Sequence, residues 1–214
     1  MAQLVNKCKF YFRKSSFKKD IKSGIFLLNL ISEIKPKNFL EIGVLEGVTS
    51  RNVCDLLNKI NRGNFSYIGI DLFGDNVIEN NSKEFTPISY KINNPLKWLY
   101  FKVILRMRPN SKDCVEHLLK KYKNSINILK GYSKDLLKEI DLKEIDFVFL
   151  DGGHSYKTVK EDLRLLILNL KKDSVILCDD YNILHYGVKK AIDEIKDNHV
   201  FKDFGRFAFL QIKK

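Results

Sequence analysis

Short apolar runs of strand length alternate with longer amphipathic patterns along most of the chain. The strand-like runs lie at residues 37–43, 65–72, 126–131, 145–152 and 174–180. Apolar side chains at helical spacing predict helices at about 21–34, 48–61, 155–169 and 187–197. This alternation is typical of βαβ units, so we expect a parallel sheet with helices on both faces.

The end of the chain carries a different pattern. Residues 199–204 and 206–213 are two further apolar runs separated only by Gly205, which predicts two short strands joined by a tight turn. With 214 residues, the chain has the length of a single domain, 1–214. The expected fold is therefore α/β: a Rossmann-like, doubly wound sheet of seven strands, mostly parallel with a C-terminal antiparallel hairpin.

Composition narrows the class of protein further. No apolar run reaches the length of about 18 residues that spans a bilayer, and basic residues interrupt the N-terminal apolar stretches before a signal peptide can form. The four cysteines, Cys8, Cys54, Cys114 and Cys178, lie far apart without a CxxC pair. This spacing argues against a disulfide framework and against a zinc cluster, so we expect a cytoplasmic protein with reduced thiols.

The net charge of +12 is concentrated in two regions. Residues 1–38 carry nine basic and two acidic side chains, and residues 74–124 carry ten and five. Such regions favour an anionic ligand, an acidic glycan, a nucleic acid or a membrane surface, although lysines on exposed faces can also serve solubility alone. The basic segment 1–36 is expected to be helical, with its first 20 residues either in peripheral membrane contact or packed on the domain or a second subunit.

The segment 74–124 is too long for an ordinary crossover between two strands. It contains the only tryptophan, Trp98, and a cluster of basic residues before a helix predicted near 111–123. Long structured insertions in compact domains usually form lids or binding loops. We expect a lid or acceptor-binding element here, with a helical contact in a homodimer as the competing interpretation.

The first predicted strand runs directly into a turn with glycines at Gly43 and Gly47, followed by a helix. Glycine lets the backbone turn sharply and approach a ligand, and the helix N-terminus offers unpaired N–H groups. The spacing is not the dinucleotide GxGxxG fingerprint, and such glycines often serve chain geometry alone. The second strand ends in Asp71, where a carboxylate can accept both hydroxyls of a ribose.

Three more carboxylates follow the fourth and fifth strands. Asp151, Asp179 and Asp180 should meet at the carboxyl edge of the sheet, where they repel one another unless a cation lies among them. Oxygen ligands of this kind predict Mg²⁺ or a similar divalent ion, while the alternative is that they cap the following helices. His154 is a candidate general base or a structural turn residue, and Tyr181 and His185 are further candidates for the same cleft.

Five segments, taken in order, resemble those of a class I S-adenosylmethionine (SAM) dependent methyltransferase. They are residues 39–47, 68–73, 128–137, 145–163 and 175–181. The series "FLEIGVLEG", "IGIDLF", "ILKGYSKDLL", "IDFVFLDGGHSYKTVKEDL" and "VILCDDY" is most similar to the metal-dependent small-molecule O-methyltransferases. The chain is similar to both the catechol-like and the macrolide-sugar branches of this group. An Asp rather than an Asn at the third metal position resembles the macrolide-sugar branch more closely.

The resemblance implies specific roles. Glu41, Gly43 and Gly47 would shape the SAM pocket, Asp71 would hold the ribose hydroxyls, and Ser133 would contact the adenine. Asp151 would border the cofactor and, with Asp179 and Asp180, bind the divalent metal. His154 takes the position of a catalytic lysine in the catechol-type enzymes, so Asp151 and His154 are the expected catalytic residues.

The expected function is methyl transfer from SAM to a hydroxyl of a small molecule, with Mg²⁺ orienting and helping to deprotonate it. A sugar or polysaccharide precursor is the favoured acceptor, and a catechol-like phenol is the second. One alternative is an RNA-binding or RNA-modifying methyltransferase, based on Phe10, Tyr11, Phe12 and Phe17 among basic residues; the absence of a known RNA-binding motif makes nucleic acid the weaker partner. Another is an iron-dependent hydroxylase of similar fold.

Overall fold

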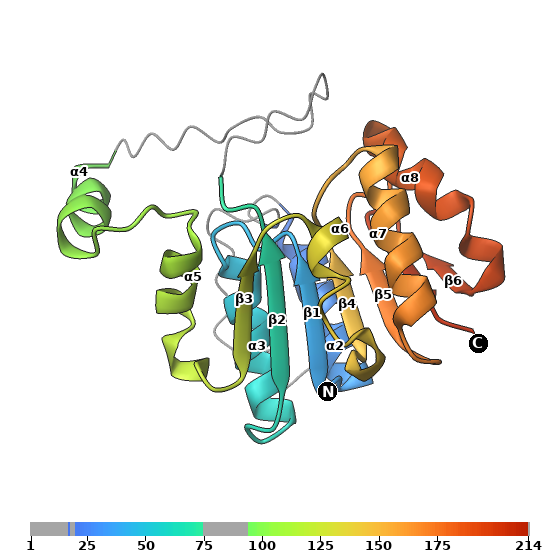
Figure 1. The fold of residues 1–214 in the computed structure, drawn as a ribbon, viewed down its shortest axis with the longest axis horizontal. Coiled ribbons are helices and arrows are strands. Elements are labelled where there is room, and N and C mark those ends of the chain that lie inside the picture. The colour runs from blue at the N-terminus through green and yellow to red at the C-terminus, as the bar shows by residue number, and fades with distance from the viewer. Residues whose placement is uncertain (1–16, 18–19, 75–93, 214) are drawn as a thin grey trace.

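The protein is described by a computed structural model that covers Phe17 and residues 20–74 and 94–213. A seven-stranded sheet runs through the molecule in the order β3-β2-β1-β4-β5-β7-β6 (Figure 1). All neighbours from β3 to β5 pair in parallel, and β7 pairs antiparallel with both β5 and β6. The strands are β1 Asn38–Ile42, β2 Ser66–Asp71, β3 Ile126–Lys130, β4 Phe147–Leu150, β5 Val175–Cys178, β6 Val200–Asp203 and β7 Ala208–Gln211.

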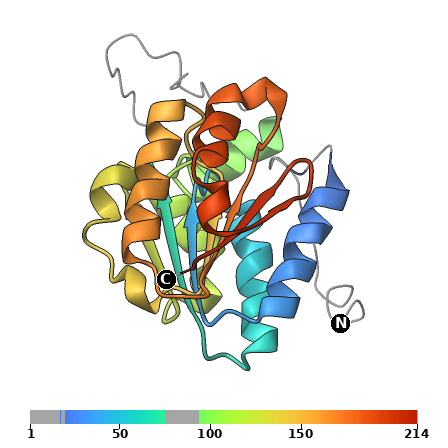
Figure 2. The same ribbon diagram turned by 90° about the vertical axis from the view of Figure 1, so that its right-hand side faces the viewer.

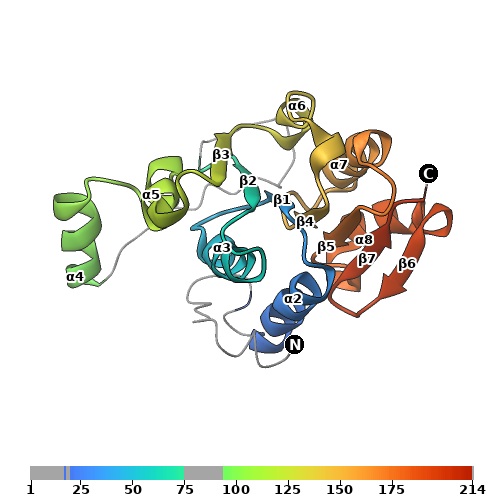
Figure 3. The same ribbon diagram turned by 90° about the horizontal axis from the view of Figure 1, so that it is seen from below.

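Helices cover both faces of this sheet (Figures 2 and 3). One face packs against α2 (Ile21–Ile34), α3 (Val48–Ile60) and α5 (Lys112–Leu118). The other packs against α6 (Ser133–Leu136), α7 (Tyr156–Asn169) and α8 (Tyr186–Asp193). The expected α/β fold is confirmed, and the strand order reverses between β1 and β4, where open α/β sheets bind ligands.

The predicted helices are confirmed with two shorter than expected. The helix predicted near 111–123 ends as α5 at Leu118, and the 3-10 turn Lys120–Tyr122 follows it. Residues three apart are eclipsed in a 3-10 turn, which lets both Leu119 and Tyr122 enter the core. The helix predicted at 187–197 likewise ends as α8 at Asp193, before a second 3-10 turn, Lys196–Asn198.

Residues 94–105 of the insertion project away from the sheet, whereas α5 packs on it (Figure 1). The projecting residues contain α4 (Pro95–Trp98), which continues into a π-helical turn, Leu99–Ile104. Apolar side chains of these two helical segments are exposed to solvent: Leu96 is 76% exposed and Ile104 is 65% exposed. The lid, acceptor-binding and dimer interpretations of this insertion stay predictions.

The N-terminal segment is described only from Phe17 and Asp20 onward, so most of the predicted basic amphipathic segment lies outside the described residues. Phe17 itself is fully buried, with its ring 6.3 Å from that of Phe149 and 6.1 Å from that of Phe207. The Phe17 ring is therefore part of the core, and the RNA-binding alternative stays a prediction. None of the helices in the described ranges is long and apolar enough to cross a membrane.

Candidate active site

The turn between β1 and α3 is built around Gly43, which has a φ of +99°. A Cβ on this residue would lie 1.9 Å from the carbonyl oxygen of Asp151, so no other residue fits without moving β4. At the far side of the turn, Gly47 has a φ of +71°, and a Cβ there would lie 3.0 Å from Val115. The tight glycine turn is confirmed, and Gly43 lets the backbone after β1 pack directly on the backbone after β4.

Asp71 ends β2 beside this turn. Its Oδ2 accepts a hydrogen bond from the Leu45 N–H at 2.7 Å, and its Oδ1 accepts one from the Phe73 N–H at 2.7 Å. A carboxylate has about four lone-pair positions, so two remain for hydroxyl donors. The structure therefore fixes the orientation of Asp71 and is compatible with the ribose role, which stays a prediction.

Glu41 lies in β1, two residues before Gly43, and is buried. Its Oε2 accepts a hydrogen bond from the Tyr67 hydroxyl at 2.5 Å, whereas Oε1 has no hydrogen-bond partner among the described residues. Burial raises the pKa of Glu41 to about 7, although Tyr67 and Ser50 oppose the shift. Glu41 thus links β1 to Tyr67 of β2, with one carboxylate oxygen left to accept a hydrogen bond.

Ser133 starts α6, and its hydroxyl donates a hydrogen bond to Oδ2 of Asp162 in α7 at 2.9 Å. Asp162 is buried, and burial raises its pKa to about 6. The Ser133 side chain therefore has a structural partner that the sequence did not suggest. Its predicted contact with adenine stays a prediction.

One pocket lies at the ends of β4 and β5, and it is lined by Asp151, Asp179, Asp180 and His154. The expected convergence of these groups is therefore observed. Burial, together with the charges of Asp179 and Asp180, raises the pKa of Asp151 well above its ordinary value. A cation in this pocket would favour the ionised carboxylates.

Asp179 has a strong partner that the sequence analysis missed. Its Oδ1 lies 2.6 Å from Nε of Arg206, and its Oδ2 accepts a second hydrogen bond from Nη2 of the same guanidinium at 2.7 Å. Arg206 sits in the turn between β6 and β7, and its guanidinium also lies 4.7 Å from the ring centroid of Phe17. No spacing in the sequence relates Arg206 to Asp179, because the antiparallel return of β7 brings them together.

Asp180 has different neighbours. Its Oδ2 lies 2.9 Å from Nε2 of His154 and 3.7 Å from Nε2 of His185. The two histidines, together with Arg206, lower the pKa of Asp180.

Tyr181, the other candidate for this cleft, is buried, and its hydroxyl donates to Asp193 of α8 at 2.7 Å instead. Tyr181 is therefore wrong as a cleft residue, because its ring packs under α8.

The predicted Mg²⁺ site fits this arrangement only in part. Asp151 and Asp180 offer carboxylate oxygens, while both oxygens of Asp179 are engaged by Arg206. The assignment of all three aspartates as metal ligands therefore stays a prediction. So do the catalytic roles of Asp151 and His154, which lie in the same pocket.

Comparison with known proteins agrees with this geometry. Residues 40–181 match a family model described as a methyltransferase domain. No curated protein sequence matches the chain. Among solved structures, the calicheamicin methyltransferase CalS11 is similar with a TM-score of 0.63 and 17% identity, over 99% of this chain and 85% of that one.

Two further structures show the same fold. The O-methyltransferase NovP has a TM-score of 0.62 and 16% identity, over 89% of this chain and 81% of its own. TomG from Streptomyces achromogenes, an O-methyltransferase involved in tomaymycin synthesis and solved in complex with SAM, has a TM-score of 0.59 and 13% identity, over 90% and 80%. Since the family match spans more than half of the sequence, the chain belongs to the methyltransferase-domain family, and the predicted class I methyltransferase is confirmed.

Proposed function

We propose that this methyltransferase transfers the methyl group of SAM to a hydroxyl oxygen of a small molecule. Family membership supports methyl transfer, and TomG, a structural neighbour solved with SAM, is an O-methyltransferase. The observation that carries the proposal is the glycine turn after β1, which packs directly on the backbone of Asp151 and holds the Asp71 carboxylate through the Leu45 N–H. In open α/β sheets a nucleoside binds at this end of the strands, beside a carboxylate that accepts its ribose hydroxyls.

The donor side of the site would bind and orient the cofactor. Asp71 would accept hydrogen bonds from the ribose hydroxyls, and the N–H groups at the start of α3 would face polar atoms of the methionine portion. Glu41 would support this turn, and Ser133 would lie next to the adenine. Holding the sulfonium methyl in line with the attacking oxygen supplies much of the rate enhancement.

The opposite side of the site would prepare the acceptor. A divalent ion such as Mg²⁺, when bound here, lowers the pKa of an acceptor hydroxyl. Asp151 and Asp180 would hold that ion, with Asp179 as the third predicted ligand. Asp151 and His154 would orient the hydroxyl, and His154 would take its proton on the ring nitrogen that does not face Asp180.

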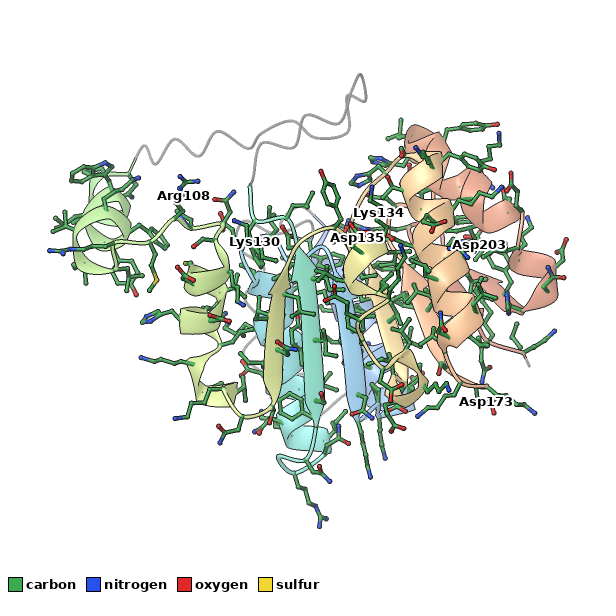
Figure 4. The ribbon with its side chains drawn as sticks, in the orientation of Figure 1. Arg108, Lys130, Lys134, Asp135, Asp173 and Asp203 are labelled. Atoms are coloured by element: carbon green, nitrogen blue, oxygen red, sulfur yellow. The ribbon has the colours of Figure 1, made fainter. Side chains whose placement is uncertain are left out.

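A sugar or polysaccharide precursor carrying a phosphate or carboxylate is the proposed acceptor. Basic side chains support an anionic acceptor: Arg108, Lys130 and Lys134 all lie toward the carboxyl edge of the sheet, although Asp135 lies there too (Figure 4). The insertion would cover the acceptor or contact a second subunit in a homodimer, and the N-terminal segment would allow peripheral membrane contact. The three described cysteines are unpaired, which supports the proposed cytoplasmic location.

Calorimetry with S-adenosylhomocysteine tests the donor site directly. Asp71→Asn should weaken binding about 10-fold or more, because an amide replaces one ionised acceptor of the ribose hydroxyls. Asp173→Asn is the matched control, since Asp173 lies at the opposite end of the sheet (Figure 4). No binding to the parent protein, or equal binding by the parent and the Asp71 variant, would contradict the proposal.

The acceptor is tested by following S-adenosylhomocysteine release with a panel of vicinal diols. Sugars that carry a phosphate or carboxylate should be methylated faster than neutral sugars and catechols. EDTA should suppress turnover, and a divalent ion should restore it. Full turnover in EDTA would remove the proposed role of the ion without affecting the donor site.

A further inference from the structure

Two histidines and one aspartate converge beside the carboxylate pocket. His154 comes from the loop after β4, Asp180 follows β5, and His185 ends the 3-10 turn Ile183–His185 before α8. Both imidazoles direct Nε2 toward the same oxygen, Oδ2 of Asp180, at 2.9 and 3.7 Å. One ligand atom from each residue lies within 4.8 Å of the other two.

The backbone holds these three residues in place. Asp180 has a φ of +57°, an uncommon conformation for a residue other than glycine. Oδ1 of Asn182 accepts hydrogen bonds from the Leu184 and His185 N–H groups, which fixes the turn that carries His185. A Cβ at Gly187 would lie 2.6 Å from the His154 carbonyl oxygen, so this glycine allows α8 to approach the His154 loop closely.

The neighbouring ion pair makes the three residues a separate group. Arg206 engages both oxygens of Asp179, whose side chain is 0% exposed, while the Asp180 side chain is 23% exposed and reaches the histidines. We propose that His154, Asp180 and His185 bind a divalent first-row transition metal, such as Zn²⁺, Fe²⁺ or Mn²⁺, in place of the Mg²⁺ expected for three carboxylates.

The distances suit such an ion. Ligand atoms at about 2.1 Å from a tetrahedral or octahedral ion lie about 3.0 to 3.4 Å from one another. The two observed separations of 2.9 and 3.7 Å bracket this range, so small rotations of the imidazole rings would complete the site. Mg²⁺ prefers oxygen ligands and water, whereas imidazole suits zinc, iron and other transition metals.

The exposure of the group indicates a reactive rather than a structural site. The side chains of His154 and His185 are 45% and 37% exposed, so positions on the ion opposite the protein would open to solvent. Three protein ligands with open positions are typical of catalytic metal centres. The inference deepens the proposed function, on which it rests for the role of the ion, and it makes His154 a ligand instead of the base.

Metal binding by the full-length protein, stripped with EDTA and dialysed, tests this assignment without an activity assay. Calorimetry should show one equivalent of Zn²⁺ binding at least about 100-fold more tightly than Mg²⁺. Co²⁺ should give the visible absorption bands of a nitrogen- and oxygen-ligated ion. His154→Ala and His185→Ala should each weaken Zn²⁺ binding about 10-fold or more.

His117→Ala is the matched control, because His117 lies in α5 and outside the group. It should bind Zn²⁺ as the parent does, and circular dichroism should show that all variants are folded. Failure of the parent to bind Zn²⁺ and Co²⁺, equal affinities for Zn²⁺ and Mg²⁺, or unchanged Zn²⁺ binding in both His154→Ala and His185→Ala would overturn the assignment. S-adenosylhomocysteine binding is measured in parallel, so a failed metal site is distinguishable from a failed donor site.

Discussion

The two halves of the carboxyl edge are organised in different ways. At the ends of β1 and β2, the geometry comes from the backbone: a glycine turn packed on the backbone of Asp151 and an aspartate fixed by two N–H groups. At the ends of β4 and β5, it comes from side chains that pair across distant elements, such as Asp179 with Arg206 and His154 with Asp180. Where backbone segments are in direct contact, even one added carbon atom causes a clash. Where charged side chains pair, the geometry depends instead on which partner is present.

The largest effect is expected at Gly43, the centre of the backbone-defined half. Gly43→Ala places a Cβ 1.9 Å from the Asp151 carbonyl oxygen at a φ of +99°. Overpacking and the left-handed conformation together should lower the free energy of unfolding by about 4 kcal/mol. Urea denaturation measures this loss, and S-adenosylhomocysteine binding should be lost with it.

Gly63→Ala separates the two causes. Gly63 also has a positive φ, +86°, but its nearest neighbour would be 3.9 Å from the new Cβ. Only the conformational cost of about 1–2 kcal/mol should remain. Equal losses at Gly43 and Gly63 would show that the contact with β4 does not constrain the turn.

The second effect tests the side-chain half. Arg206→Met leaves the buried Asp179 carboxylate without its charged partner, which should lower the free energy of unfolding by about 3 kcal/mol near pH 8. Burial already raises the pKa of Asp179, and losing Arg206 removes the interaction that opposes this rise. The loss should therefore shrink as the pH falls and Asp179 becomes protonated.

Urea denaturation at pH 5 and pH 8 measures the Arg206 effect. Arg164→Met is the control, because the Arg164–Glu161 pair is exposed and should contribute less than about 1 kcal/mol. A pH-independent loss in the Arg206 variant would mean that packing on Phe17 dominates over the charge of Asp179.

A third effect concerns Glu41, where burial raises the pKa from 4.5 to about 7. The folded protein binds the proton more tightly than the unfolded chain, so stability is lost as the pH rises through this range. Glu41→Gln should remove that loss and stabilise the protein by about 3 kcal/mol at pH 8 relative to the parent, with no gain at pH 4. Thermal unfolding at both pH values measures it, and a gain equal at the two values would exclude the titration.

The smallest effect is expected at Ser133. Ser133→Ala removes the hydrogen bond to the buried Asp162 and should lower the free energy of unfolding by about 1 kcal/mol. If the hydroxyl serves only Asp162, S-adenosylhomocysteine affinity should not change. A clear loss of affinity with normal stability would instead favour the predicted adenine contact.

Much of the fold and half of the site could be predicted from local pattern. Alternating strand and helix periodicities specified the parallel sheet, and chain order alone placed Asp71, Asp151 and Asp180 at one edge, because parallel strands share a direction. The glycine turn could also be predicted from the sequence, because a sharp backbone turn of this kind requires glycine at a specific position.

The partners of the charged side chains could not be predicted in this way. The sequence by itself determined the sheet, the edge where the acidic residues gather and the glycine turn beside Asp71. Only the tertiary structure decided that Asp179 pairs with Arg206, that Ser133 holds Asp162 and that His185 joins His154 at Asp180. These pairings depend on the return of β7 and the close approach of α8 at Gly187, which are long-range packing events that no local periodicity records.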